Sequence, residues 1–411
     1  MLNVQHLQKS RTLRTSSQPR NDLKKTREKA VNEIPVFEQE LWTSKQRQAN
    51  SIHEVSYRAC FKPQLPAYFI GQLTHEGDAV YDPFSGRGTT AVEAALRGRR
   101  VIANDINPLS EILTRPRLEV PTVSEIDKRL RELHFSATVA TDIDLSMFFH
   151  QNTLNEILGL RRYLAQRHRA GHEDHVDRWI RMVATNRLTG HSPGFFSVYT
   201  LPPNQAVSPE NQIKINQKLD QTPSYKDVRA LILRKSMQLQ GGIAAADRWR
   251  LRTAAESAHF LTGGAAATKE IESNSVQLTV TSPPFLDVVQ YAKDNWLRCW
   301  FNNLDAEAIA AGITMSRTVE EWDGRMAPVF SELYRITKPG GWVAFEVGEV
   351  RKGKIRLEER VAPLGTEAGF VCEAILINAQ RFTKTANIWG VGNNEAGTNS
   401  NRIVIFRKAA P

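Results

Sequence analysis

Cysteine is scarce in this chain, with 3 in 411 residues. Cys60, Cys299 and Cys372 lie far apart, so no pair has the spacing of a zinc-binding or redox motif. An odd count also argues against a disulfide framework. We therefore expect a reducing, cytoplasmic setting and no metal site.

Long apolar runs are missing as well. No stretch approaches the ~20 residues that a membrane-spanning helix needs, and the polar, basic amino terminus lacks the apolar centre of a signal peptide. Acidic residues are in deficit: 44 Asp and Glu oppose 54 Lys and Arg, which gives a formal net charge of +10. That balance favours a polyanionic partner and carries no information about the fold.

A glycine-containing stretch from Asp82 to Thr90 organises the rest of the chain. The apolar run 79–81 before it predicts a buried strand, and 91–96 after it predicts a helix. Gly86 and Gly88 let the backbone turn sharply and approach a ligand closely. Strand, glycine turn and helix together are typical of a ligand-binding α/β unit.

A second predicted strand, 101–104, ends at Asp105, about 20 residues past Gly86. In a wound α/β sheet, an acid at this position hydrogen-bonds ribose hydroxyls. A GxG pair alone occurs in many tight turns, so the alternative is a structural turn with a helix-capping aspartate. The order of strand, loop, helix, strand and acid favours the ligand-binding interpretation.

The sequence Ser282-Pro283-Pro284-Phe285 follows another predicted strand, 276–280. Two prolines directly after a buried strand cannot extend it. They stiffen a loop at the carboxyl end of the strand, where ligands bind in such sheets.

These two loops resemble those of the DNA amino-methyltransferases, which use S-adenosylmethionine. Their motifs are a strand followed by DPF-x-G-x-G-T and a strand followed by [DNS]-P-P-[YFW]. The resemblance covers about residues 56–110 and 258–408. It implies an α/β fold with a Rossmann-like methyltransferase sheet, mostly parallel and closed by an antiparallel pair at 371–377 and 402–406. The alternative is two tight loops of a different wound α/β enzyme.

The resemblance also implies roles for particular residues. Tyr57 and Phe61 would close over the cofactor, although aromatic core packing explains them equally well. Many relatives contact the cofactor adenine with an acid where this chain has Gly264, so we expect main-chain groups to do so here. The implied cofactor-binding residues are Asp82, Phe84, Gly86, Gly88, Thr89, Asp105 and Tyr57, and the implied catalytic residues are Ser282, Pro283, Pro284 and Phe285.

The catalytic loop suits methyl transfer to an exocyclic amine, whose lone pair is delocalised into the base. The Ser282 hydroxyl and the Pro283 carbonyl accept hydrogen bonds from the amino group, and Phe285 offers a stacking face. The base must first be flipped out of the duplex. No cysteine follows a proline, which argues against transfer to cytosine carbon 5. Because the Ser form is commoner among cytosine 4-amino enzymes of the family, we expect cytosine, with adenine 6-amino transfer as the alternative.

The chain divides into four predicted regions: a basic flexible arm (1–34), a first methyltransferase part (35–119), a helical insertion (120–257) and a second methyltransferase part (258–411). The insertion is basic, and Phe195, Phe196 and Tyr199 lie beside its loops, so we expect it to recognise the target. We take His168, His172 and His175 as a surface loop rather than a metal site.

Double-stranded DNA is the expected partner, and a restriction nuclease in a restriction-modification pair is a further candidate. An RNA amino-methyltransferase and a non-catalytic protein that binds nucleic acid are the competing hypotheses.

Overall fold

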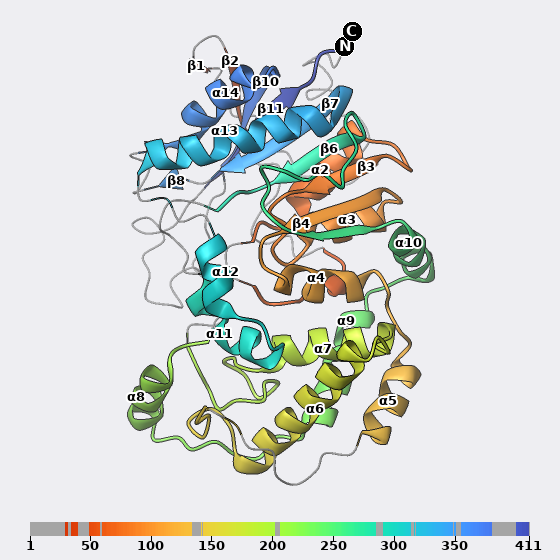
Figure 1. The fold of residues 1–411 in the computed structure, drawn as a ribbon, viewed down its shortest axis with the longest axis vertical. Coiled ribbons are helices and arrows are strands. Elements are labelled where there is room, and N and C mark those ends of the chain that lie inside the picture. Colours follow the sequence, from red (N-terminus) through yellow and green to blue (C-terminus); the bar gives the residue numbers. More distant parts are fainter. Residues whose placement is uncertain are drawn as a thin grey trace, which may run out of the picture.

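The computed structural model describes residues 29–31, 34–39, 49–57, 60–133, 141, 143–201, 206–284, 291–313, 316, 318–347, 349–350, 355–379 and 400–410. A nine-stranded sheet in the order β1-β2-β10-β11-β7-β6-β3-β4-β5 forms its upper half (Figure 1). The strands are β1 (Lys29–Val31), β2 (Ile34–Gln39), β3 (Ala79–Asp82), β4 (Arg100–Asp105), β5 (His259–Thr262), β6 (Val276–Thr281), β7 (Thr337–Val347), β10 (Val371–Ala379) and β11 (Ser400–Arg407). A separate short pair joins β8 (Glu349–Val350) and β9 (Ile355–Arg356).

The strand directions confirm the predicted Rossmann-like sheet. Strands β5, β4, β3, β6 and β7 are parallel to one another, whereas β11 pairs antiparallel with both β7 and β10. A parallel sheet places the carboxyl ends of its strands at one edge. The loops after β3, β4, β5 and β6 therefore meet there, and these are the loops that carry the two motifs.

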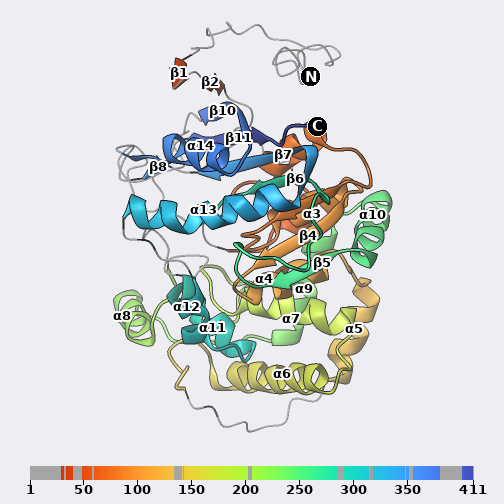
Figure 2. The same ribbon diagram turned by 45° about the horizontal axis from the view of Figure 1, so that its top comes forward.

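Successive side chains of the central strands enter two different hydrophobic cores, as the pleat requires. On β3, Val80 packs in one core and Tyr81 in the other. On β7, Ala344 and Phe345 divide in the same way. Helices α2 (Gln64–Leu73) and α3 (Thr89–Leu96) contribute to the first core, and α13 (Val319–Ile336) and α14 (Leu357–Glu367) to the second. Figure 2 shows α13 and α14 together on one side of the sheet.

The chain between β4 and β5 is helical and forms most of the lower half in Figure 1. Its core is continuous with that of the sheet, because Leu160 and Trp179 belong to the same buried cluster as Val80 and Val92. The helices are α4 (Leu109–Thr114), η2 (Arg115–Arg117), α5 (Val123–Glu132), α6 (Gln151–Arg169), α7 (His175–Arg187), α8 (Pro209–Leu219), α9 (Val228–Gln240) and α10 (Ala245–Glu256). After β6, α11 (Tyr291–Phe301) and α12 (Ala306–Gly312) pack beside them.

The segment 49–57, which includes η1 (Ser51–His53), joins the insertion to the sheet. Asn186 of α7 and Arg298 of α11 both donate to the Ser56 carbonyl, at 2.9 and 3.1 Å. On its other side, buried His53 lies 2.7 Å from Glu93 of α3. This segment is therefore bonded to both halves of the molecule.

Two features differ from the sequence-based expectations. Lys29–Val31, within the predicted flexible arm, forms β1, and β2 extends the sheet by pairing parallel with β10. These strands are too short for their periodicity to distinguish them from loop. Residues 1–28 lie outside the described residues. The second difference is that Phe195 and Phe196, expected as exposed aromatics, are 7% and 1% exposed.

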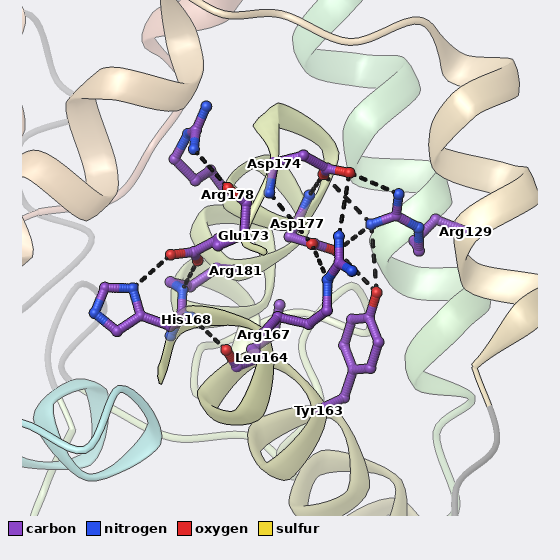
Figure 3. A network of polar contacts seen from close by, with 10 residues as sticks. All are labelled: Arg129, Tyr163, Leu164, Arg167, His168, Glu173, Asp174, Asp177, Arg178 and Arg181. Carbon is purple, nitrogen blue, oxygen red and sulfur yellow. Dashed lines mark hydrogen bonds and ion pairs between the residues drawn. The ribbon is translucent and has the colours of Figure 1, made fainter. Parts of the chain in front are cut away.

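A network of ion pairs fastens α5, α6 and α7 together (Figure 3). Asp177 is fully buried, and it accepts hydrogen bonds from Arg129, from Tyr163 at 3.0 Å and from Arg167 at 2.8 Å. Burial alone would raise the pKa of Asp174, but hydrogen bonds from Arg129 and from the Asp177 amide hold it at about 2. Several cations of the insertion are thus used internally and are unavailable to a ligand.

The three histidines do not share one loop, because His168 lies in the last turn of α6, His172 between the two helices, and His175 at the start of α7. This region joins the network. His168 lies 2.7 Å from Glu173, which also pairs with Arg181. Within the described ranges, no three His, Cys, Asp or Glu side chains gather as metal ligands would. Of the helices described, none has the length and apolar character needed to cross a membrane.

We predict that Asp177→Ala lowers the free energy of unfolding by about 3–5 kcal/mol, because it leaves Arg129 and Arg167 without their buried counter-charge. Urea denaturation measures the change. His168→Ala removes an exposed pair of the same network, so it should cost less than about 1 kcal/mol. Equal costs for the two variants would contradict a buried anchor at Asp177.

Candidate active site

The loop after β3 turns through two glycines in left-handed conformations, with φ of 53° at Gly86 and 73° at Gly88. A side chain at Gly88 would place its Cβ 2.7 Å from the Cβ of Thr114, which excludes any other residue without rearrangement. A Cβ at Gly86 would lie 3.7 Å from the Tyr57 ring. The first glycine thus brings bare backbone beneath Tyr57, and the second lets α3 approach α4.

Asp105, at the end of β4, holds this loop in place. Its Oδ2 accepts from the Gly86 amide at 2.8 Å, and its Oδ1 accepts from the Asn107 amide at 2.9 Å. Burial raises the pKa of Asp105, and the backbone hydrogen bonds oppose that rise. Each carboxylate oxygen keeps a second lone pair, so the group is still able to accept from a ribose hydroxyl.

Asp82 connects the glycine loop to the strand that precedes the Ser-Pro-Pro loop. Its Oδ1 accepts from the Thr281 hydroxyl at 2.6 Å and from the Phe84 amide at 3.1 Å. Its Oδ2 is buried with no hydrogen-bond partner among the described residues, and burial raises the pKa of Asp82 to about 7.

A cavity opens where these loops meet, with about 1090 Å³ of empty space including its mouth. Of the sequence-predicted cofactor residues, five line it, whereas Asp82 and Gly88 support the loop from behind. Helix α13 forms a further wall that the sequence did not indicate. The lining residues include Tyr57, Phe84, Gly86, Thr89, Asp105, Ile106, Asn107, Gly264, Ser282, Pro284, Arg325, Met326 and Val329.

The Ser-Pro-Pro loop forms part of the cavity wall. Ser282 and Pro284 line the cavity, and Pro283 between them is buried. Phe285 lies outside the described residues. Two of the four predicted catalytic residues thus share one cavity with five of the predicted cofactor residues.

Comparisons with known proteins find similarity over part of the chain. Residues 4–112 match the model of a family described as DNA methylase. The type II methyltransferase M.MvaI of Kocuria varians is 31% identical over 98 residues, which are 23% of this chain and 20% of that protein. Part of the chain is thus similar to DNA methylases, which agrees with the resemblance seen in its two loops.

Other relatives match over similarly short stretches. The type II methyltransferase M.MjaII of Methanocaldococcus jannaschii is 30% identical over 91 residues, 22% of this chain and 17% of that protein. The match thus spans about a fifth of each relative. Among solved structures, the rRNA methyltransferase aviRa of Streptomyces viridochromogenes is 12% identical, with 88% of this chain and 90% of that chain covered and a TM-score of 0.36.

S-adenosylmethionine, the cofactor that the resemblance implies, would supply an electrophilic methyl group when bound. The cavity has features that fit this cofactor. The buried Ser85 Oγ and Asn107 Nδ2 belong to lining residues and have no partner within the described part of the chain. Gly86 and Asp105 would hold its amino-acid and ribose parts, and Ile106 and Val329 offer apolar contact.

The part of the cavity beside Gly264, where the resemblance would place the cofactor adenine, lacks an acid. A Cβ at Gly263 or Gly264 would meet no atom within 4 Å, so open space lies above these glycines, and no carboxylate follows β5 at this point. Arg325 of α13, an exposed cation, lines the same cavity. The wall that adenine would meet is therefore made of backbone, small side chains and one guanidinium group.

The candidate site contains an acid that the sequence did not indicate. The Ser282 hydroxyl donates to Glu346 near the end of β7, and Asn401 of β11 donates to the Oε1 of Glu346 at 3.0 Å. Glu346 is 6% exposed, and burial raises its pKa. The available signal was a glutamate inside the apolar run Trp342–Val347, because a buried acid in a strand requires a partner.

We predict that Asp105→Asn weakens S-adenosylmethionine binding by about 10–100-fold, since it removes charge-assisted bonds from the Gly86 loop and from the bound ribose. Isothermal titration calorimetry measures the dissociation constant. Asp127→Asn, which breaks an exposed pair with Arg131 on α5, is the matched control and should leave the affinity unchanged. An unchanged affinity in Asp105→Asn would remove Asp105 from the cofactor site.

Proposed function

We propose that the protein transfers a methyl group from S-adenosylmethionine to the exocyclic amino group of a base flipped out of double-stranded DNA, with the 4-amino group of cytosine favoured. One observation carries the proposal: Ser282 and Pro284 line the same cavity as Gly86 and Asp105. A base presented to the Ser-Pro-Pro loop would therefore lie next to a cofactor on the glycine loop.

The contacts of Ser282 explain how the loop would activate a poor nucleophile. Because its hydroxyl proton is donated to Glu346, the lone pairs on the Ser282 oxygen are left to accept from the amino group. The amino nitrogen forms a bond to the methyl carbon as the carbon–sulfur bond breaks, and one amino proton is released. Ser282 and Glu346 provide a path for that proton.

The choice between cytosine and adenine depends on one feature of the loop. The serine form of the loop favours cytosine, and the 6-amino group of adenine is the runner-up. A second substrate class has one specific observation in its favour: a tRNA (guanine(37)-N(1))-methyltransferase of Danio rerio is 40% identical over 70 residues, 16% of this chain. RNA is therefore included among the substrates to test.

The insertion would supply the DNA-binding surface, and the structure separates its cations into two groups. Arg181, Arg187 and Lys235 are buried and have structural roles. On α8, Lys214 and Lys218 are exposed. The chain just before α8 is bonded to α11, because Trp296 donates to the Val207 carbonyl at 3.2 Å, and both views show α8 beside α11 and α12 (Figures 1 and 2). We assign α8 to the side of the molecule that meets DNA.

We predict that Ser282→Ala and Glu346→Gln each lower the single-turnover rate of methyl transfer by about 10²–10⁴-fold, while the dissociation constant for S-adenosylmethionine stays within about twofold. Protonated Glu346 cannot take up the proton that leaves the amino group through Ser282, so the wild-type rate should rise with pH through the pKa of Glu346, which burial raises. In Glu346→Gln this rise should disappear. Wild-type rates in both variants would refute this chemistry.

We further predict that the double variant Lys214→Ala/Lys218→Ala binds duplex DNA more weakly and lowers the slope of log affinity against log salt by up to about 2, because two phosphate contacts are lost. Arg250→Ala/Arg252→Ala removes equal charge from α10 on the opposite side of the molecule (Figure 1) and is the control. Fluorescence anisotropy across a salt series makes the comparison. Equal slopes in the two double variants would place the DNA elsewhere.

A further inference from the structure

We propose that Trp322 is a positioning residue for methyl transfer, because it holds the Ser-Pro-Pro loop by the carbonyl of Pro284. Its indole Nε1 donates to the Pro284 oxygen at 3.0 Å, and its side chain is 1% exposed. Trp322 lies in the first turn of α13, far from the loop in sequence. The inference rests on the proposed function and identifies a residue outside both motifs.

The Ser-Pro-Pro loop has few ways to fix its own position. Neither proline has an amide N–H, so these residues cannot donate a backbone hydrogen bond to a neighbouring strand. Its anchors must therefore be side chains or donors that reach its carbonyls. In the described structure, Ser282 donates to Glu346, Thr281 donates to Asp82 at 2.6 Å, and Trp322 donates to Pro284. The last two bonds lie on either side of Ser282 and Pro283.

These two anchors enclose the predicted catalytic acceptors. Ser282 and Pro283 lie between Thr281 and Pro284 in the chain, so both ends of this dipeptide are held by buried hydrogen bonds. Trp322 fixes the carbonyl next to that of Pro283, and the Pro283 carbonyl is the second acceptor proposed for the amino group of the base.

Trp322 is itself firmly held. Thr318 caps α13 by accepting from the Glu321 amide at 3.2 Å. Asp323, which follows Trp322 in the chain, pairs with Arg360 of α14 at 2.8 Å. Met326 packs with Trp322 in the same buried cluster and also lines the cavity. The helix that holds the loop is therefore also a wall of the cofactor cavity. A buried indole N–H without an acceptor is costly, so folding of α13 onto the sheet favours the loop position that supplies the Pro284 carbonyl.

The test compares two buried tryptophans that each donate one hydrogen bond. Trp179 in the insertion is fully buried and donates to the Ser236 hydroxyl at 2.9 Å. Trp322→Phe and Trp179→Phe both remove a buried indole N–H and should lower the midpoint of thermal unfolding to a similar extent. We expect Trp322→Phe to slow single-turnover methyl transfer by 10–100-fold, with the dissociation constant for S-adenosylmethionine within twofold of wild type. Trp179→Phe should leave the rate unchanged.

A second variant separates hydrogen bonding from packing. Trp322→benzothienylalanine replaces the indole N–H by sulfur and keeps the size of the ring, so it should fold as the wild type does and show the same slowing. Wild-type rates in this variant would overturn the proposal, as would a loss of cofactor affinity equal to the loss of rate. If the wild-type protein itself transferred no methyl group to DNA or RNA, the proposed function would fail instead, and the two failures are distinguishable.

Discussion

The hydrogen bond between Thr281 and Asp82 is the interaction on which the candidate site depends. It joins the end of β6 to the end of β3, and thereby joins the loop expected to hold the base to the loop expected to hold the cofactor. Its length is 2.6 Å, and it is buried where water cannot compete for either partner. Asp105 and Trp322 extend the same principle, since each fixes a loop at the sheet edge by a bond to its main chain.

The helical insertion is packed against the sheet and bonded to it. Its helices share a buried core with the sheet, and the segment 49–57 is bonded to α7, to α11 and to α3. The ion pairs around Asp177 then fix α5, α6 and α7 to one another (Figure 3). A base-flipping enzyme has to hold the duplex at a fixed distance from its catalytic loop, and a rigid connection of this kind would meet that requirement.

The parts of the fold that could be predicted are those whose signals are local. The apolar runs before Gly86 and before Ser282 identified β3 and β6, and the glycine and proline signals located the loops at their ends. Glu346 and Trp322 could not be assigned to the site in this way. They come from β7 and α13, which reach the site only through the strand order of the sheet and the packing of α13.

The number of Lys and Arg residues in the sequence was a poor predictor of the charge exposed on the surface of the insertion. Arg181 and Lys235 count toward a basic insertion in the sequence, yet their side chains are buried beside Glu173 and Glu54. A count of charges cannot show which cations fold against a carboxylate, because that depends on contacts between distant helices. Only cations that stay exposed, such as those on α8, carry the expected affinity for phosphate.

The identity of the methylated nucleoside tests the central claim most directly. Purified protein is incubated with labelled S-adenosylmethionine and unmethylated genomic DNA, the DNA is digested, and the labelled nucleoside is identified. The account predicts label in 4-methylcytosine. Label in 6-methyladenine would keep the amino-methyltransferase and correct the base, whereas no label in DNA would contradict the account and leave RNA as the substrate to examine.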